Sequence, residues 1–202
     1  MSVDGGSPWN RNIHYHRVVL DALPAGCGRA LDAGCGQGFL TRELAPRCSE
    51  VVALDLDRAT LARARALTDP DPRVTFVEGD VMTQPFEPGS FDLVATVAML
   101  HHLPLEPALA RLRDLVRPGG VLAIVGLHAL RPLDYWQMFV AIPLTLLLRV
   151  RYGFTHVGAP IKDPRETLPQ IREACHAQLP GATFRRHLLF RYSIVWPKPL
   201  SG

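Results

Sequence analysis

The chain has 202 residues, of which 48% are hydrophobic and 20% are charged, so it holds enough apolar material for one domain with a substantial core. Its formal net charge is only +3 and its basic residues are scattered, which argues against a nucleic-acid-binding protein. Its four cysteines show neither CxxC spacing nor histidine pairing suited to zinc. We therefore expect free thiols in a reducing compartment and no metal site.

The N-terminal residues 1–9 lack the basic start and apolar core of a secretory signal, so we expect a cytoplasmic location. Residues 133–150 are leucine-rich but contain Asp134, Gln137 and Pro143. Their purely apolar part is shorter than the ~20 residues that span a bilayer. We expect no stable membrane insertion there, and a lid or a lipid-facing patch are both open alternatives.

Predicted elements alternate along the first two thirds of the chain. Apolar side chains at helical spacing in residues 11–23 predict an opening helix. The runs of Val, Leu and Ala that follow do not alternate with polar residues, which is typical of strands covered on both faces of a parallel sheet. The predicted strands are 29–33, 50–55, 73–77, 91–97 and 120–126, and the predicted helices between them are 38–46, 58–67 and 106–116.

The last third of the chain changes character. Residues 129–165 mix aromatic, leucine-rich and Pro/Gly elements and resemble an insertion more than another crossover. A helix is predicted over 166–178. Two β-rich runs, 183–189 and 191–196, then lie too close together for a helical crossover, so we expect them to pair antiparallel.

An acid followed by alternating glycines marks the end of the first predicted strand. Asp32 precedes Gly34, Gly36 and Gly38, where a Cβ would block both the turn and the close approach of a ligand to the backbone. A dinucleotide fingerprint has a different spacing, and its pyrophosphate would lie unfavourably close to Asp32. S-adenosylmethionine carries a sulfonium and an ammonium group and no phosphate, so it suits this loop better.

The second predicted strand also ends in an acid, Asp55. An ionised carboxylate at this place can accept hydrogen bonds from two vicinal hydroxyls, so we expect Asp55 to bind the ribose of a nucleoside cofactor. Capping of the next helix is the alternative role, for which Asp57 is the better candidate.

Further motifs follow in order. Residues 74–81 form an apolar run that ends near an acid, residues 91–103 end in Leu-His-His-Leu, and Arg-Pro-Gly-Gly at 117–120 turns into the apolar run 121–126. Together these motifs resemble the class I S-adenosylmethionine-dependent methyltransferases, especially the small-molecule branch of the type 11/25 kind. That family implies a Rossmann-like, seven-stranded, mostly parallel sheet with helices on both faces and a C-terminal antiparallel hairpin.

The resemblance implies one methyltransferase domain over residues 1–202. Within it we expect an N-terminal helix cap at 1–28, a cofactor-binding core at 29–126, an insertion or lid over the substrate pocket at 127–165, and a C-terminal helix and hairpin at 166–202. The implied cofactor is S-adenosyl-L-methionine, and the product is S-adenosyl-L-homocysteine.

The family pattern also assigns roles to cofactor residues. Asp80 resembles the acid that binds the adenine amino group, with the Val81 amide nearby, and loop capping is its alternative role. We expect Asp32 to act through solvent or through the amide network of the loop. Tyr15 lies on the opening helix that covers the cofactor in relatives, so contact with the methionine end or the substrate is expected, and a half-buried surface aromatic is its alternative role. The expected cofactor-binding set is Tyr15, Asp32, Gly34, Cys35, Gly36, Asp55, Leu56, Asp80, Val81 and Val97.

Two histidines are the candidate catalytic residues. In similar sugar O-methyltransferases the first histidine of the Leu-His-His-Leu element resembles the base, which favours His101, and a purely structural pair is the alternative. We expect one of His101 and His102 to point inward and the other outward. His128 follows the fifth strand and is the second acid–base candidate, at a place where relatives often have acids.

The expected activity is methyl transfer to a small apolar or aromatic acceptor, with O-methylation favoured, as in bacterial secondary metabolism. The acceptor lining would include Tyr135, Trp136, Met138 and Phe139, although core packing of a lid is an alternative role for them. A non-methylating cyclisation or rearrangement and a nicotinamide-dependent oxidoreductase are the competing functions. No Asn/Asp-Pro-Pro-Tyr element for a flipped base is present. We expect a monomer or a homodimer.

Overall fold

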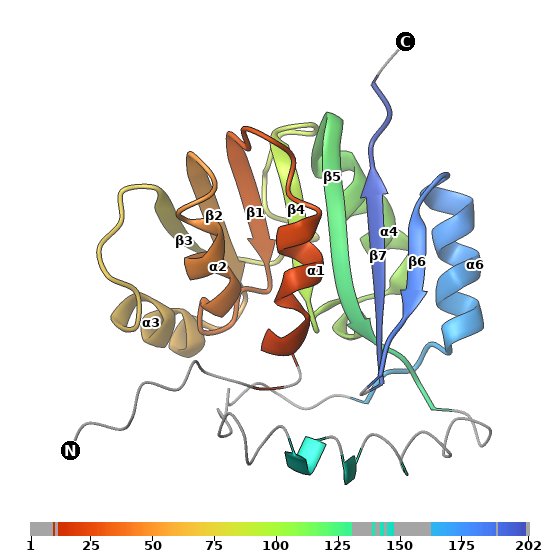
Figure 1. Ribbon diagram of the computed structural model, residues 1–202. Coiled ribbons are helices and arrows are strands. Elements are labelled where there is room, and N and C mark those ends of the chain that lie inside the picture. Colours follow the sequence, from red (N-terminus) through yellow and green to blue (C-terminus); the bar gives the residue numbers. More distant parts are fainter. Residues whose placement is uncertain are drawn as a thin grey trace.

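A computed structural model describes residues 10, 12–130, 139, 142–143, 145–147, 163–188 and 190–200. These residues build a seven-stranded sheet with the order β3-β2-β1-β4-β5-β7-β6 (Figure 1). The first five strands are parallel, and β7 runs antiparallel to both of its neighbours, β5 and β6. The strands are β1 (Arg29–Ala33), β2 (Glu50–Asp55), β3 (Val74–Glu78), β4 (Phe91–Val97), β5 (Val116–Leu127), β6 (Thr183–Arg186) and β7 (Arg191–Pro197).

The predicted parallel sheet and its closing hairpin are confirmed, with two corrections to strand ends. The strand predicted at 120–126 begins earlier, at Val116, because the Arg-Pro-Gly-Gly stretch forms an irregular part of β5 and is not a separate turn. The register against β4 shifts between Phe91 and Leu93 at this point. The first hairpin strand ends at Arg186, three residues before its predicted end at 189.

The helices follow the predicted order. The opening element is shorter than predicted over 11–23, and it starts as a 3-10 turn whose first amides bond to the side chain of Asn10. The 3-10 turn after β4 was not predicted. The helical elements are η1 (Ile13–Tyr15), α1 (His16–Asp21), α2 (Phe39–Leu44), α3 (Arg58–Ala66), η2 (Leu100–His102), α4 (Leu105–Leu115) and α6 (Leu168–Gln178).

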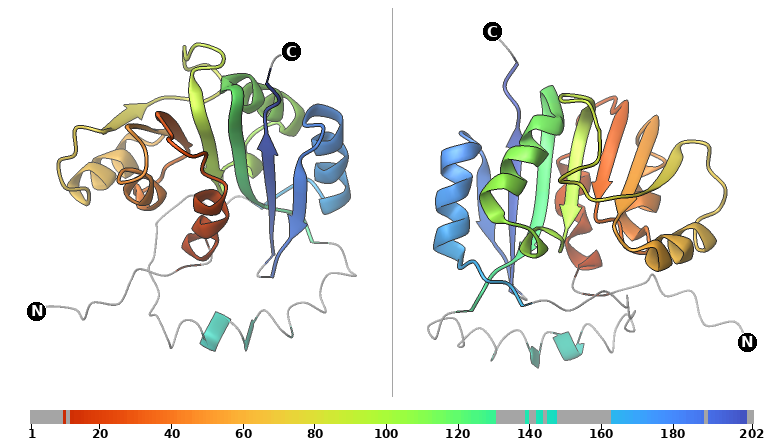
Figure 2. Two further views of the ribbon diagram at one scale, coloured as in Figure 1. Left: turned by 45° about the horizontal axis from the view of Figure 1, so that its top comes forward. Right: turned by 180° about the vertical axis from the view of Figure 1, so that it is seen from behind.

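Helices cover both faces of the sheet, as expected for strands that are apolar on both sides (Figure 2). On one face, Val19 of α1 and Leu44 of α2 pack against Ala30 and Val51 of the sheet. On the other face, the core includes buried side chains of α4 and α6, with α4 and α6 also in contact with each other. Because strands β1 to β5 run parallel, they all end at one common edge of the sheet, the lower one in Figure 1.

Candidate active site

The order of the strands places a ligand site between β1 and β4. The chain runs from β1 outward to β2 and β3 and then returns to β4 on the other side of β1. In open α/β sheets, ligands bind outside the carboxyl ends of the strands at such a switch point. The glycine loop after β1 and the turn after β4 meet at this place.

The glycine loop is fixed to the end of β2 by backbone hydrogen bonds. The amides of Gly34 and Cys35 donate to the carbonyl of Leu54 at 2.8 and 2.9 Å, and the amide of Gly36 donates to Asp55 Oδ2 at 2.8 Å. The Cys35 thiol is buried, and burial raises its pKa. The loop is therefore preformed, and its thiol stays protonated at neutral pH.

Two glycines of this loop meet different surroundings. Gly34 has a φ of +74°, and a Cβ there would lie 2.6 Å from Met99 Cγ, so the turn after β4 packs directly on the loop. Gly36 has a φ of +55°, and nothing lies within 4 Å of the place where its Cβ would be. The loop thus carries bare backbone facing open space, which fits a small ligand held against the chain.

Asp55 has spare hydrogen-bonding capacity next to this open space. Its two oxygens accept from the amides of Gly36 and Asp57, at 2.8 and 2.9 Å, and the side chain is half-buried. An ionised carboxylate offers about four acceptor positions. Asp57, and not Asp55, caps α3 by accepting from the amide of Thr60. Helix capping, the alternative role for Asp55, is therefore performed by Asp57, as expected. Leu56, between them, is 71% exposed.

The loop after β3 holds Asp80 and Val81. Asp80 Oδ1 accepts from the amide of Met82 at 2.9 Å, so the loop-capping role is present, and it occupies one carboxylate oxygen. Arg111 of α4 donates to the carbonyls of Val81 and Gln84, at 3.1 and 2.5 Å. The sequence did not indicate this role of Arg111, because its partners are backbone carbonyls, which every residue carries.

Asp32 lies below the glycine loop, 2% exposed. Burial raises its pKa to about 6, against the opposing effect of a 2.6 Å hydrogen bond from the hydroxyl of Thr41. His16 lies close enough to lower that pKa, and its ring contacts Glu43 at 3.1 Å. Asp32 therefore joins β1 to α2, and its indirect role toward the cofactor stays a prediction.

The turn after β4 places the histidine pair at the same edge. Val97 ends the strand, and Ala98 adopts a left-handed φ of 57°, which is uncommon for a residue with a side chain. The rings of His101 and His102 then lie together, 4.1 Å between centroids with a 40° tilt. The expectation that one of them points inward and the other outward stays a prediction.

His128 is buried at the end of β5, next to the end of β4. Its Nδ1 lies 3.0 Å from the carbonyl of Ala129. A carbonyl only accepts, so Nδ1 is the donor in this contact, and in the neutral tautomer that fits it the lone pair is on Nε2. Within the described part of the chain, Nε2 has no hydrogen-bond partner, although the residue is only 2% exposed. Such an atom is suited to accept a proton from a bound hydroxyl.

The N-terminal turn is tied to the tip of the hairpin. The hydroxyl of Tyr15 donates to the carbonyl of Leu188 at 2.6 Å, and Arg191 donates to Asn12 Oδ1 at 2.8 Å. The Tyr15 ring also packs against His187 with 5.0 Å between centroids. Its hydroxyl thus serves the hairpin, and contact of this residue with the cofactor stays a prediction.

The insertion is described only in part. Phe139 is 84% exposed, so its ring does not line an enclosed pocket as predicted. The other three residues of the predicted acceptor lining, Tyr135, Trp136 and Met138, lie outside the described residues. Among the helices that the structure describes, none is both long and apolar enough to cross a bilayer.

Comparison with known proteins places these features in a family. A model of the methyltransferase domain matches residues 31–124. An uncharacterized methyltransferase of Mycobacterium bovis is 38% identical over 197 residues, covering 96% of this chain and 98% of that protein. The 2-methyl-6-phytyl-1,4-hydroquinone methyltransferase of Synechocystis is 35% identical over 124 residues, covering 58% and 39%.

A solved structure shares the whole fold. The S-adenosylmethionine dependent methyltransferase of Mesorhizobium loti superposes with a TM-score of 0.62 at 19% identity, covering 90% of this chain and 96% of that one. The relative from Mycobacterium matches over nearly its full length, and the predicted motifs from Asp32 to Gly120 lie where the fold brings them together. The chain therefore belongs to the class I, S-adenosylmethionine-dependent methyltransferase family.

Proposed function

We propose that this enzyme methylates a hydroxyl group of a small apolar, aromatic acceptor. The observation that carries the proposal is the buried lone pair of His128 Nε2, fixed by the bond between Nδ1 and the carbonyl of Ala129. A group that removes a proton is useful when the acceptor is a hydroxyl, because the oxygen becomes a better nucleophile as it loses its proton. His101, at the end of the neighbouring strand, is the second candidate for this role.

We propose that the cofactor lies across the glycine loop. Asp55 would hold the ribose hydroxyls with its remaining acceptor positions, Gly34 and Gly36 would face the amino-acid part, and Asp80 with Val81 would bind the adenine. Leu56, exposed beside Asp55, offers an apolar surface for the adenine ring. When bound, S-adenosylmethionine supplies a methyl carbon activated by positive sulfur and leaves as S-adenosylhomocysteine.

The residues of this chain would then hold the acceptor in line with the methyl carbon and take its proton. As its oxygen takes the methyl group that the bound cofactor would supply, the acceptor would pass its hydroxyl proton to His128 Nε2 or to His101. Positioning and exclusion of water supply much of the acceleration in such a displacement. The hydroquinone named for the relative from Synechocystis carries two aromatic hydroxyls and an apolar tail, which supports an acceptor of this chemical class.

A panel of phenols and hydroquinones with increasing alkyl length tests the proposal. We expect transfer of the labelled methyl group to an oxygen, with one S-adenosylhomocysteine released per product. Unchanged S-adenosylmethionine would favour the non-methylating alternative, and tighter binding of NAD than of S-adenosylhomocysteine would favour an oxidoreductase. Methylation only at carbon or nitrogen would contradict the assignment of a hydroxyl acceptor.

Substitution of the histidines separates the two candidate bases. His128→Asn keeps a donor for the carbonyl of Ala129 but lacks the Nε2 lone pair, so we expect kcat to fall about 100-fold with KM nearly unchanged. His101→Asn is the parallel variant. Affinity for S-adenosylhomocysteine should stay unchanged in both, which distinguishes lost proton transfer from lost structure. Equal kcat in both variants and the wild type would show that neither histidine is the base.

We also infer, from the bacterial relatives, a cytoplasmic enzyme of bacterial secondary metabolism that acts as a monomer or a homodimer. A producing strain that lacks the gene should accumulate the unmethylated acceptor, which mass spectrometry of extracts would detect. Light scattering would give the oligomeric state.

A further inference from the structure

The exposed apolar side chains of this protein concentrate at the carboxyl edge of the sheet. Nine large hydrophobic side chains are exposed among the described residues, and one of them, Leu56, belongs to the proposed cofactor site. Six others form what we call the apolar rim. Leu130 follows β5 and Leu188 lies in the turn between β6 and β7, both at this edge. Phe139, Ile142, Leu146 and Leu147 belong to the helical segment beyond it.

The helical part of the rim presents its apolar stripe to solvent. Phe139, Ile142, Leu146 and Leu147 follow the spacing i, i+3, i+7 and i+8, which puts them on one face of a helix. Phe139 is 84% exposed and Leu147 65% exposed, whereas Thr145, on another side of the same turn, is only 6% exposed. The usual pattern of a surface helix is reversed here, since the apolar side faces outward and a polar residue faces inward.

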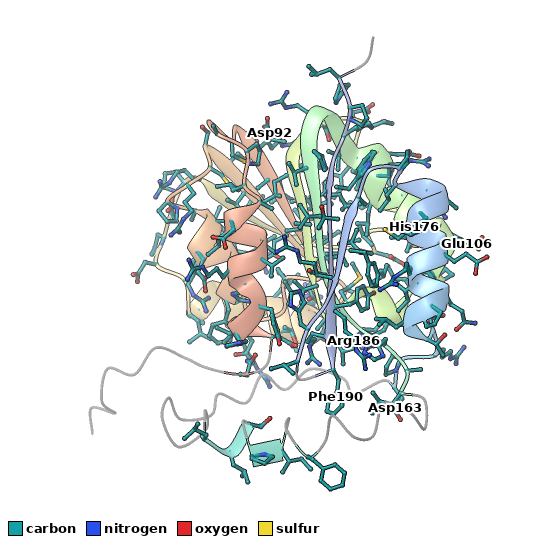
Figure 3. The ribbon with its side chains drawn as sticks, turned by 45° about the vertical axis from the view of Figure 1, so that its right-hand side comes forward. Asp92, Glu106, Asp163, His176, Arg186 and Phe190 are labelled. Atoms are coloured by element: carbon teal, nitrogen blue, oxygen red, sulfur yellow. The ribbon has the colours of Figure 1, made fainter. Side chains whose placement is uncertain are left out.

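Positive charge accompanies the rim. Arg165, Arg185 and Arg186 are exposed around the hairpin and the segment before α6, with Asp163 as the exposed acid nearby. Figure 3 shows Arg186, Phe190 and Asp163 at the same lower end of the molecule as the helical segment. In the sequence, residues 131–162 carry four basic residues and one acid, a net charge of +3. Apolar side chains accompanied by cations are typical of segments that lie in the interface of an anionic bilayer.

We propose that the apolar rim docks on the surface of a lipid bilayer that contains anionic lipid. The rim side chains would enter the interface, and the arginines around them would meet the headgroups. A bilayer accommodates scattered side chains from a helix, a hairpin tip and the end of β5 without a complementary shape, which a protein partner would need. The open edge of the sheet would then face acceptors dissolved in the membrane. This last step alone rests on the proposed function.

Flotation with vesicles tests the docking. The wild-type chain should bind vesicles of phosphatidylcholine with about one third phosphatidylglycerol, and it should bind pure phosphatidylcholine several-fold less. The double variant L146E/L147E should bind the anionic vesicles about tenfold less, because two inserted leucines are replaced by charges. Neither leucine belongs to the proposed catalytic or cofactor-binding set.

The chain offers a matched control. L67E/L200E changes the same net charge at two leucines of similar exposure that lie away from the rim. We expect this variant to bind anionic vesicles as the wild type does, within about twofold. Circular dichroism and affinity for S-adenosylhomocysteine should be the same in all three proteins, because the replaced side chains are exposed.

Three results would overturn the docking. They are absence of wild-type binding to anionic vesicles, equal loss in both double variants, and a change from dimer to monomer in L146E/L147E with vesicle binding intact. The last result would make the rim an interface between two copies of the chain. Failure of the proposed function looks different: vesicle binding would persist although no hydroxyl acceptor is methylated, in detergent or in vesicles.

Discussion

The proposed cofactor side of the molecule, around the glycine loop, and the proposed acceptor side, at the end of β5 and the hairpin tip, are held together in different ways. Around the glycine loop, the contacts join residues close in sequence, such as Thr41 with Asp32 nine positions earlier and Gly36 with Asp55 nineteen positions later. On the other side, Tyr15 bonds to Leu188 across 173 positions, and Arg191 bonds to Asn12 across 179. The first side is a local motif, and the second exists only once the whole chain has folded.

This difference matches two tasks, since the cofactor is the same in every member of the family and the acceptor varies. The glycine loop is held by backbone donors and one carboxylate, which suits one cofactor of constant shape. The proposed acceptor side would be formed by the end of β5, the hairpin tip and residues of the insertion, none of which belongs to the glycine loop. Binding residues commonly lie on such connecting segments, carried by a rigid sheet.

The largest expected effect is the loss of cofactor affinity when Asp55 is replaced. Asp55→Ala removes the acceptor for Gly36 and the proposed acceptor for two ribose hydroxyls, so binding of S-adenosylhomocysteine should weaken by about 3–6 kcal/mol. Calorimetry measures this loss. Asp57→Ala is the matched control, since it removes only the cap of α3 and should lower stability slightly with affinity unchanged. Comparable affinities for wild type and Asp55→Ala would refute the ribose assignment.

The second prediction tests whether burial of Asp32 sets a pH dependence. Its folded pKa of about 6 lies above its ordinary value of 3.8, so between these values the folded state keeps a proton that the unfolded state has lost. Its contribution to stability therefore falls as pH rises from about 4 to 6.

Asp32→Asn keeps an acceptor for Thr41 and cannot ionise. Between pH 4 and pH 7, the unfolding free energy of the wild type should fall relative to that of the variant by about 2 kcal/mol. Urea titrations at several pH values measure it. A difference that does not vary with pH would mean that His16 and Thr41 keep the carboxylate ionised throughout.

The third prediction concerns the contact between Gly34 of the glycine loop and Met99 of the turn after β4. Gly34→Ala combines a left-handed φ with a Cβ placed 2.6 Å from Met99 Cγ, whereas Gly181→Ala has a similar φ of +82° and open space around it. Overpacking usually costs about 1–3 kcal/mol. Gly34→Ala should therefore be less stable than Gly181→Ala by this amount in thermal or urea unfolding. Equal losses would show that Met99 moves aside freely.

Sequence reasoning succeeded where a residue type has a local geometric meaning. The strand ends at Ala33 and Asp55, the capping by Asp57 and the antiparallel hairpin all follow from runs, spacings and turns of neighbouring residues. It failed where the outcome depends on packing of distant parts or on backbone acceptors. The tilted contact between the rings of His101 and His102 and the bonds from Arg111 to carbonyls are of this kind, because no pattern of side chains in the sequence indicates them.

The smallest expected effect tests how tightly the distant parts of the acceptor side are joined. Tyr15→Phe removes only the hydroxyl that donates to the carbonyl of Leu188, a loss of about 1 kcal/mol in unfolding free energy. If that hydroxyl serves the hairpin alone, affinity for S-adenosylhomocysteine should stay within about twofold of wild type, because the ring still packs on His187. A larger loss of affinity with unchanged stability would place the hydroxyl on the cofactor. Tyr15 would then belong to the proposed cofactor side of the molecule, and the opening helix would serve the cofactor as well as the hairpin.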